Sequence, residues 1–157
     1  MRFRALTALS LAALAPCSAA AATRIDDPAA FVTAVYARYA KHTGYQPSTD
    51  IYTPRLAALF AADMRESGAV PPELGRLDFN FWYDAQDTDD GMPGIVKITV
   101  EDAPHAPDRR VVDVSFTNFS PHENRFYFEK SADGWKLDDV TSVSEGWALS
   151  LILRYGQ

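Results

Sequence analysis

The chain has 157 residues, and its 21 acidic against 15 basic residues give a formal net charge of −6 at pH 7. Nucleic acids and anionic membrane surfaces attract basic patches, so this acidic balance argues against both kinds of partner. The chain has one cysteine, Cys17, which argues against a disulfide scaffold and a thiolate metal site.

Residues 1–22 have the pattern of a secretory signal peptide. Two arginines precede an apolar run over residues 5–15, and small residues follow, with cleavage expected near residues 20–22. The run is too short for a permanent membrane-spanning helix. A lipid anchor at Cys17 is the alternative, although Pro16 stands where lipoprotein signals have a small flexible residue. The pattern favours simple export.

The remaining residues, 23–157, are predicted to form one periplasmic or secreted domain. Removal of the signal leaves 13 basic and 21 acidic residues, a net charge of −8. Because no cysteine remains, this domain must be stabilised by core packing alone.

Two amphipathic helices are predicted first. Asp27 followed by proline caps a helix over residues 28–41. Its apolar stripe consists of Phe31, Val32, Val35, Tyr36 and Tyr39. Thr53 followed by proline caps a second helix that ends near Glu66. The core-facing residues expected on this second helix are Leu56, Leu59, Phe60 and Met64.

Stretches of alternating apolar and polar residues then predict four strands. They are GIVKITVED (94–102), RRVVDVSFTNF (109–119), RFYFEK (125–130) and GWKLDDV (134–140). The connections APHAPD, SPHEN and SADG are short, so the strands should form an antiparallel meander. The core residues expected on the last two strands are Phe126, Phe128, Trp135 and Leu137.

A short helix is predicted in the tail SEGWALSLILRYG, with Ser144 as its N-cap. Helices, antiparallel strands and a last helix give an α+β fold. The helices should lie across one concave face of a curved sheet.

The succession of sequence blocks resembles a known family. A tyrosine-rich first helix, YTPRLAALFAAD, LDFNFWYDAQD, VVDVSFTNF and DGWKLDDV occur in this order. The order is similar to the exported bacterial proteins grouped as domain of unknown function 3828. The resemblance implies a cystatin-like or nuclear-transport-factor-2-like cone, in which N-terminal helices pack on a curved antiparallel sheet. It implies no catalytic residues, and this chain departs from it by inserting TDDGMPG after Gln86 and Asp87.

The segment RLDFNFWYDAQDTDDGMPG, residues 76–94, is the main candidate for function. It carries five aspartates among several aromatic residues and contains no lysine or histidine. A calcium loop that began at Asp87 would need glycine at its sixth and glutamate at its twelfth position. Gly91 is fifth and Ile98 is twelfth, so the calcium register fails.

Three other interpretations of this segment remain open. A pair among Asp78, Asp84 and Asp87 could hydrolyse a substrate beside Trp82. The aspartates could instead cap turns while the aromatic residues are buried and Gln86 bonds the backbone. Aromatic residues among acids also suit a binding edge for a basic partner. The candidate binding residues are Asp78, Trp82, Asp84, Gln86, Asp87, Asp90 and Trp135.

The other chemistry-bearing residues give weaker patterns. His42, His105 and His122 are scattered without ligand spacing, so each is expected in a solvated loop, and no metal or cofactor is predicted. There is no nucleophile-elbow motif and no phosphate-binding glycine motif. Asp138 and Asp139 are expected to face water at a sheet edge.

These observations favour an exported, non-catalytic binding or protective module, such as an inhibitor or immunity protein that binds a basic protein. The first alternative is a carrier of a small ligand, in a cavity lined by Tyr36, Trp82, Phe116 and Trp135. The second alternative is a hydrolase that uses the carboxylates of residues 78–90.

Overall fold

The protein is described here by a computed structural model, which covers residues 23–41, 47–66, 75–86, 94–102 and 106–156. The predicted signal peptide, His42, Asp87, Asp90 and His105 lie outside these described residues. In the described part of the chain, no helix has the length and apolar character needed to cross a membrane.

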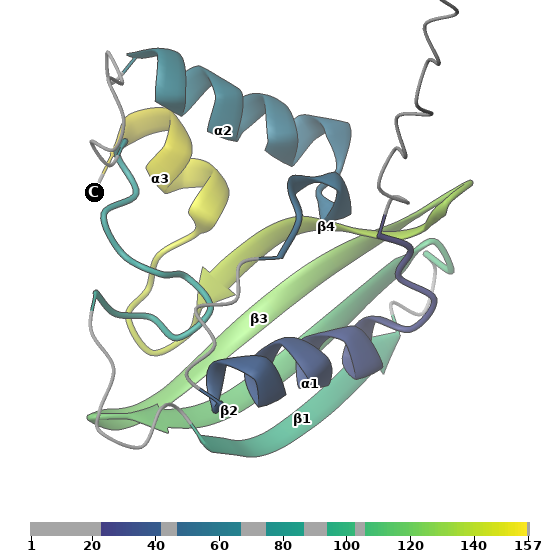
Figure 1. Ribbon diagram of the computed structural model, residues 1–157, viewed down its shortest axis with the longest axis vertical. Helices are drawn as coiled ribbons and strands as arrows, with labels where there is room; N and C mark the ends of the chain where they lie inside the picture. The colour runs from purple at the N-terminus through teal and green to yellow at the C-terminus, as the bar shows by residue number, and fades with distance from the viewer. Residues whose placement is uncertain (1–22, 42–46, 67–74, 87–93, 103–105, 157) are drawn as a thin grey trace, which may run out of the picture.

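The architecture is α+β, as predicted (Figure 1). The helices are α1 (Pro28–Tyr39), the short 3-10 helix η1 (Thr49–Ile51), α2 (Pro54–Glu66) and α3 (Leu149–Tyr155). The strands are β1 (Gly94–Asp102), β2 (Arg109–Asn118), β3 (Ser120–Ser131) and β4 (Gly134–Ser142). They form one antiparallel sheet in the order β1-β2-β3-β4, which confirms the meander.

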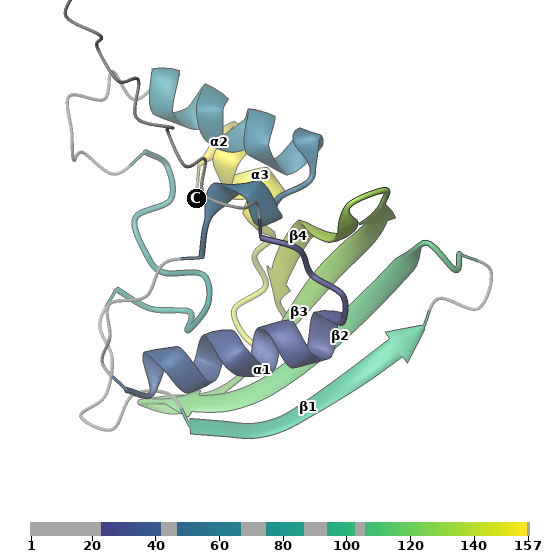
Figure 2. The same cartoon turned by 45° about the vertical axis from the view of Figure 1, so that its right-hand side comes forward.

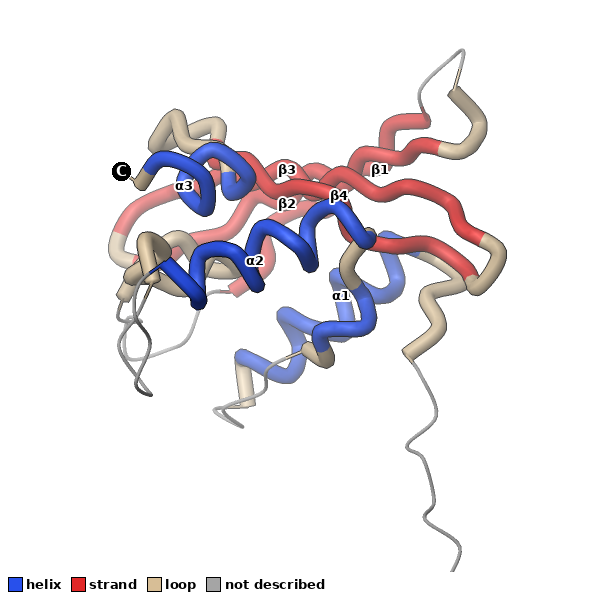
Figure 3. Tube along the Cα trace, turned by 90° about the horizontal axis from the view of Figure 1, so that it is seen from above, coloured by secondary structure: helices blue, strands red, loops and turns tan. Residues whose placement is uncertain are grey.

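The sheet curves around α1, which lies across β1 and β2 (Figure 2). The helices α2 and α3 pack against each other and against β4. Seen from above, α1 and α2 lie on the same side of the sheet (Figure 3). The concave face is therefore covered by helices, while the convex face carries polar residues and ion pairs such as Arg125–Asp113.

Helix α1 forms where the sequence pattern places it. The Asp27 side chain accepts the Ala30 N–H bond at 3.0 Å, and Pro28 occupies the first turn. The helix ends at Tyr39, two residues earlier than predicted. Its buried side chains are Pro28, Val32, Val35, Tyr36 and Tyr39. Their spacing places them on one face, which packs on the sheet.

An aromatic cluster fills the space between α1 and the sheet. Trp82 stacks on Phe126 with ring centroids 4.9 Å apart, and Tyr36 lies 5.6 Å from Phe116. The Tyr36 hydroxyl donates to the Trp82 carbonyl. Burial raises the pKa of Tyr36 well above its ordinary value, so the hydroxyl keeps its proton. The predicted ligand cavity at Tyr36, Trp82, Phe116 and Trp135 is therefore wrong, because each of these side chains is at most 4% exposed.

The outer edge of β4 is covered by backbone from three other segments. Trp135 N–H donates to the Ile25 carbonyl, Thr53 N–H donates to the Leu137 carbonyl, and Ser142 N–H donates to the Trp147 carbonyl. Trp135 also lies beneath the Arg110 guanidinium, 4.9 Å from its ring centroid. Strand β4 is thus the last strand of the sheet, but the backbone groups on its outer side are hydrogen-bonded to these segments.

The two β4 aspartates bind neighbouring helices, which corrects the expectation that they face water. Asp138 accepts bonds from the Thr53 hydroxyl at 2.7 Å and from Arg55 Nε at 3.0 Å. Asp139 accepts bonds from the N–H and hydroxyl groups of Ser150. Asp139 therefore serves the first turn of α3, a role that the sequence pattern assigned to Ser144.

Helix α2 confirms its predicted limits and, except at Met64, its predicted core-facing residues. Leu56 is fully buried, Leu59 and Phe60 are half-buried, and Met64 is 52% exposed. The buried residue near its C-terminus is instead Asp63, whose carboxylate accepts the Arg76 N–H bond at 3.0 Å. A polar contact with the following segment replaces the apolar contact expected of Met64.

The hairpin between β3 and β4 requires glycine at position 134. Gly134 has a φ of +107°, and a Cβ atom there would lie 2.7 Å from the Ile25 carbonyl oxygen. We expect Gly134→Ala to lower the free energy of unfolding by about 1–3 kcal/mol. Gly146→Ala is the control, because its φ is +75° but its Cβ would meet nothing within 4 Å. Urea denaturation that gave equal losses for both variants would contradict a role for the Ile25 contact.

Acidification should weaken the link between α2 and β4. Burial opposes ionisation of Asp138, but hydrogen bonds from Arg55 and Thr53 outweigh it and lower the pKa below its usual 3.8. Stability from a carboxyl with a lowered pKa is present above the unfolded-state pKa and is lost as the pH falls through the folded-state pKa. Native protein should therefore be more stable than Asp138→Asn at neutral pH, and this difference should shrink below about pH 3.8. Denaturation across this pH range measures the difference, and a constant gap would refute the assignment.

Candidate functional site

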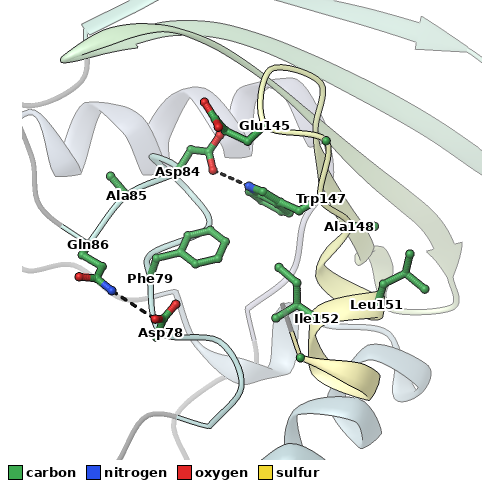
Figure 4. Close-up of a pocket in the computed structure, with 12 residues that line it drawn as sticks. Asp78, Phe79, Asp84, Ala85, Gln86, Glu145, Trp147, Ala148, Leu151 and Ile152 are labelled. Atoms are coloured by element: carbon green, nitrogen blue, oxygen red, sulfur yellow. Dashed lines mark hydrogen bonds between the residues drawn. The ribbon is translucent and has the colours of Figure 1, made fainter.

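A groove lies between residues 78–86 and the chain that follows β4 (Figure 4). Its volume is about 610 Å³. Asp78, Phe79 and Gln86 line one wall, while Glu145, Trp147 and Leu151 line the other. Of the twelve described residues that line it, three are acidic and none is lysine, arginine or histidine.

The first wall is a compact turn held by its own backbone. Asn80 N–H donates to the Ala85 carbonyl at 3.0 Å, and the Asn80 side chain accepts the Trp82 N–H bond at 2.9 Å. This turn directs Trp82 into the core and Phe79 toward Trp147, with ring centroids 5.1 Å apart. The prediction that the aromatic residues of this segment pack inward is confirmed for Phe81 and Trp82.

Asp84 is buried beneath the groove and joins three parts of the chain. Its carboxylate accepts the Trp147 Nε1–H bond at 2.6 Å and the Ser142 hydroxyl bond at 2.7 Å. His122 Nδ1 lies 3.2 Å from the same carboxylate. The side chain of Asp84 is 2% exposed, so the expectation that it lies on an open acidic edge is wrong. Burial of this charge is tolerated because hydrogen-bond donors surround it.

His122 also differs from its sequence interpretation. The predicted turn over residues 120–124 is part of β3, and the chain reverses at Phe119, whose φ is +57°. His122 consequently points inward, is 8% exposed, and stacks on Phe116 at 5.3 Å. It is a core histidine with a carboxylate partner rather than a solvated loop residue.

Ser120, His122 and Asp84 are the three residue types of a serine–histidine–aspartate hydrolytic triad. His122 Nε2 lies 3.1 Å from the Ser120 hydroxyl, and Nδ1 faces Asp84. A general base needs a free lone pair on Nε2. The Asn118 carbonyl also lies 3.1 Å from Nε2 and calls for an N–H bond there. Ser120 is not among the residues that line the groove. The trio therefore fastens the β2–β3 turn to the segment that carries Asp84.

The other predicted site residues that the structure describes lie either on the groove wall or in the core. Asp78 and Gln86 are exposed on the groove wall, and Gln86 Nε2 donates to Asp78 Oδ2 at 3.3 Å. Gln86 thus bonds a side chain at the surface, not the buried backbone as expected. Trp82 and Trp135 belong to the core. Within the described ranges, no group of three or more histidine, cysteine, aspartate or glutamate residues could hold a metal ion.

Sequence reasoning missed Glu145 and Trp147, which form the opposite wall. Both lie in a stretch interpreted as a helix, so neither showed a binding pattern. The residue that could have indicated a turn here is Gly146, which follows Glu145. In the structure, Gly146 has a φ of +75°. A glycine just after a strand predicts a turn, with the neighbouring residues at the surface of that turn.

Comparisons with known proteins add little to this geometry. No family model matches the chain, and no curated protein matches it. Among solved structures, a chain of the type VI native effector–immunity complex Tae3–Tai3 from Ralstonia pickettii is similar, with 19% identity and a TM-score of 0.48. The similarity covers 76% of this chain and 97% of that chain. These values do not assign the chain to a family.

Asp84→Asn tests the hydrogen bonds of the buried carboxylate beneath the groove. Asparagine tolerates the left-handed backbone of position 84, where φ is +57°, so the variant changes mainly the carboxylate charge. We expect a loss of about 1–3 kcal/mol in unfolding free energy, because the Ser142 hydroxyl and the Trp147 indole N–H would share a weaker acceptor. The Trp147 indole N–H resonance should also move in a ¹⁵N NMR spectrum. Asp26→Asn, at an exposed site, is the control; an unmoved indole resonance in Asp84→Asn would contradict the contact.

Proposed function

We propose that this chain is an exported, non-catalytic binding protein that holds a basic segment of a protein partner in the groove. The observation that carries the proposal is the groove's composition. It presents acidic side chains beside two aromatic rings and has no basic side chain among its lining residues. Membership in domain of unknown function 3828, with its cone-like fold, remains part of this proposal.

The shape of the groove suits a cation attached to an apolar stem. Figure 4 shows Glu145 and Asp78 at separate places along the groove, with the Phe79 and Trp147 rings between them. A lysine or arginine side chain could lay its methylene groups on these rings and direct its charge to a carboxylate. The ring faces themselves attract cations, which adds to the ion pairing.

The charge of the whole domain supports the same class of partner. The predicted mature chain carries a net charge of −8. Such a charge accelerates the approach of a basic protein and disfavours acidic competitors. An inhibitor or immunity protein that covers a basic enzyme would use both effects.

The geometry argues against hydrolysis by a pair of Asp78 and Asp84. Two-carboxylate hydrolysis needs two carboxyl groups that face one substrate. Asp84 instead directs its oxygens to Trp147, Ser142 and His122, so its carboxylate is occupied by contacts within the fold. Asp78 is exposed and accepts a bond from Gln86. The carboxylates nearest each other in sequence therefore have separate structural and surface roles.

Neutralising the groove should abolish partner capture without unfolding the protein. The test variant is Asp78→Asn with Glu145→Gln, and the matched control is Glu101→Gln with Asp133→Asn, which removes the same charge from exposed sites outside the groove. Each mature protein is used as bait in periplasmic extract and in secreted proteins of neighbouring bacteria. We expect native and control baits to capture a basic protein that the test variant loses. Equal capture by all three would refute the groove as the binding site.

Photo-crosslinking locates the contact directly. Leu151 is 54% exposed on the groove wall, whereas Val143 is 50% exposed and does not line the groove. A benzoyl-phenylalanine placed at residue 151 should crosslink to the captured partner, and one placed at residue 143 should not. The reverse pattern would place the interface elsewhere.

A further inference from the structure

A second hollow lies on the other side of the wall formed by Asp78, Phe79 and Gln86. Its volume is about 580 Å³. The groove and this hollow share these three residues, but their other lining residues differ. The aromatic residues that line the hollow are Tyr52, Phe60, Phe79, Phe81 and Tyr83.

Most of these aromatic rings are left half-buried. Tyr52, Phe60, Phe79 and Tyr83 pack against the core with one side still accessible, together with Leu77. These are five of the nine partly buried hydrophobic residues that contact the core. A gathering of half-covered apolar side chains around one hollow indicates a ligand site, because completing their burial is favourable.

The rings form a continuous surface along one side of the hollow. Tyr52 and Phe60 are stacked, with centroids 5.0 Å apart and an interplanar angle of 24°. Phe60 in turn lies 6.4 Å from Phe81. Parallel and tilted rings of this kind accept a flat aromatic molecule by stacking or edge contact.

The polar groups of the hollow favour a positively charged ligand over a negatively charged one. Asp78 is the one charged residue among the nine described residues that line it. The phenol groups of Tyr52 and Tyr83 make no hydrogen bond within the described part of the chain, so both can bond a ligand. Burial raises the pKa of Tyr52 to about 12, so its hydroxyl remains a neutral donor at physiological pH. An anionic ligand would meet a carboxylate and no cation.

We propose that this hollow binds a small aromatic molecule that carries an ammonium group. The aromatic ring lies on the Tyr52–Phe60 surface, and the ammonium group pairs with the Asp78 carboxylate. This site is separate from the protein-binding groove, although the two share a wall.

Tyramine is the test ligand, and two related compounds are its controls. The full mature chain is titrated with tyramine, with 4-hydroxyphenylacetate, which replaces the amine by a carboxylate, and with butylamine, which lacks the ring. We expect saturable NMR shifts at Tyr52, Phe60 and Tyr83 with tyramine, and at least about tenfold weaker binding of the two controls. Equal binding of 4-hydroxyphenylacetate, or no saturable shift with tyramine at millimolar concentration, would overturn the proposal.

Variants separate this proposal from the proposed function. Phe60→Leu removes one ring of the stack but keeps an apolar side chain, and Tyr83→Phe removes only a hydroxyl. Both should weaken tyramine binding and leave partner capture unchanged, while Leu151→Ala in the groove should do the reverse. Tyramine binding that survived in a folded Phe60→Leu and in Tyr83→Phe would place the ligand outside the hollow. Loss of partner capture alone would leave this proposal standing.

Discussion

The carboxylate of Asp84 is the interaction on which the rest of the site depends. It lies in a left-handed backbone position, accepts hydrogen bonds from β4 and from the turn beyond β4, and contacts His122 of β3. A buried charge is costly unless it is paired and hydrogen-bonded, so these elements are constrained to meet at one point. Through Trp147, the same contact fixes the wall of the groove opposite Phe79.

The two hollows share one wall. Asp78, Phe79 and Gln86 each face both spaces, and they are held by a short turn rather than by a helix or strand. A partner that moved Phe79 in one hollow would change the shape of the other. Two binding events across such a wall would be energetically coupled, and linkage requires the coupling to be reciprocal.

The sequence predicted the elements better than the site. The capping residues Asp27 and Thr53, the alternation along the strands and the Asp133–Gly134 turn are local signals, and the structure follows them. The site depends on contacts between distant residues. Asp84 could not be recognised as buried, because its partners lie 38 to 63 positions away. Ser144 was predicted to cap α3 on local grounds, but Asp139, eleven residues before Ser150, supplies that bond.

The coverage of β4 has a consequence for self-association. The bridges from Ile25, Tyr52 and Ala148 occupy its outer edge, whereas β1 ends the sheet on the other side. Edge-to-edge growth into a fibre needs two complementary open edges on each molecule. In the described part of the chain, β1 is the one edge without such bridges, so strand addition there would end at a pair of molecules. The cover over β4 therefore disfavours open-ended polymerisation through this sheet.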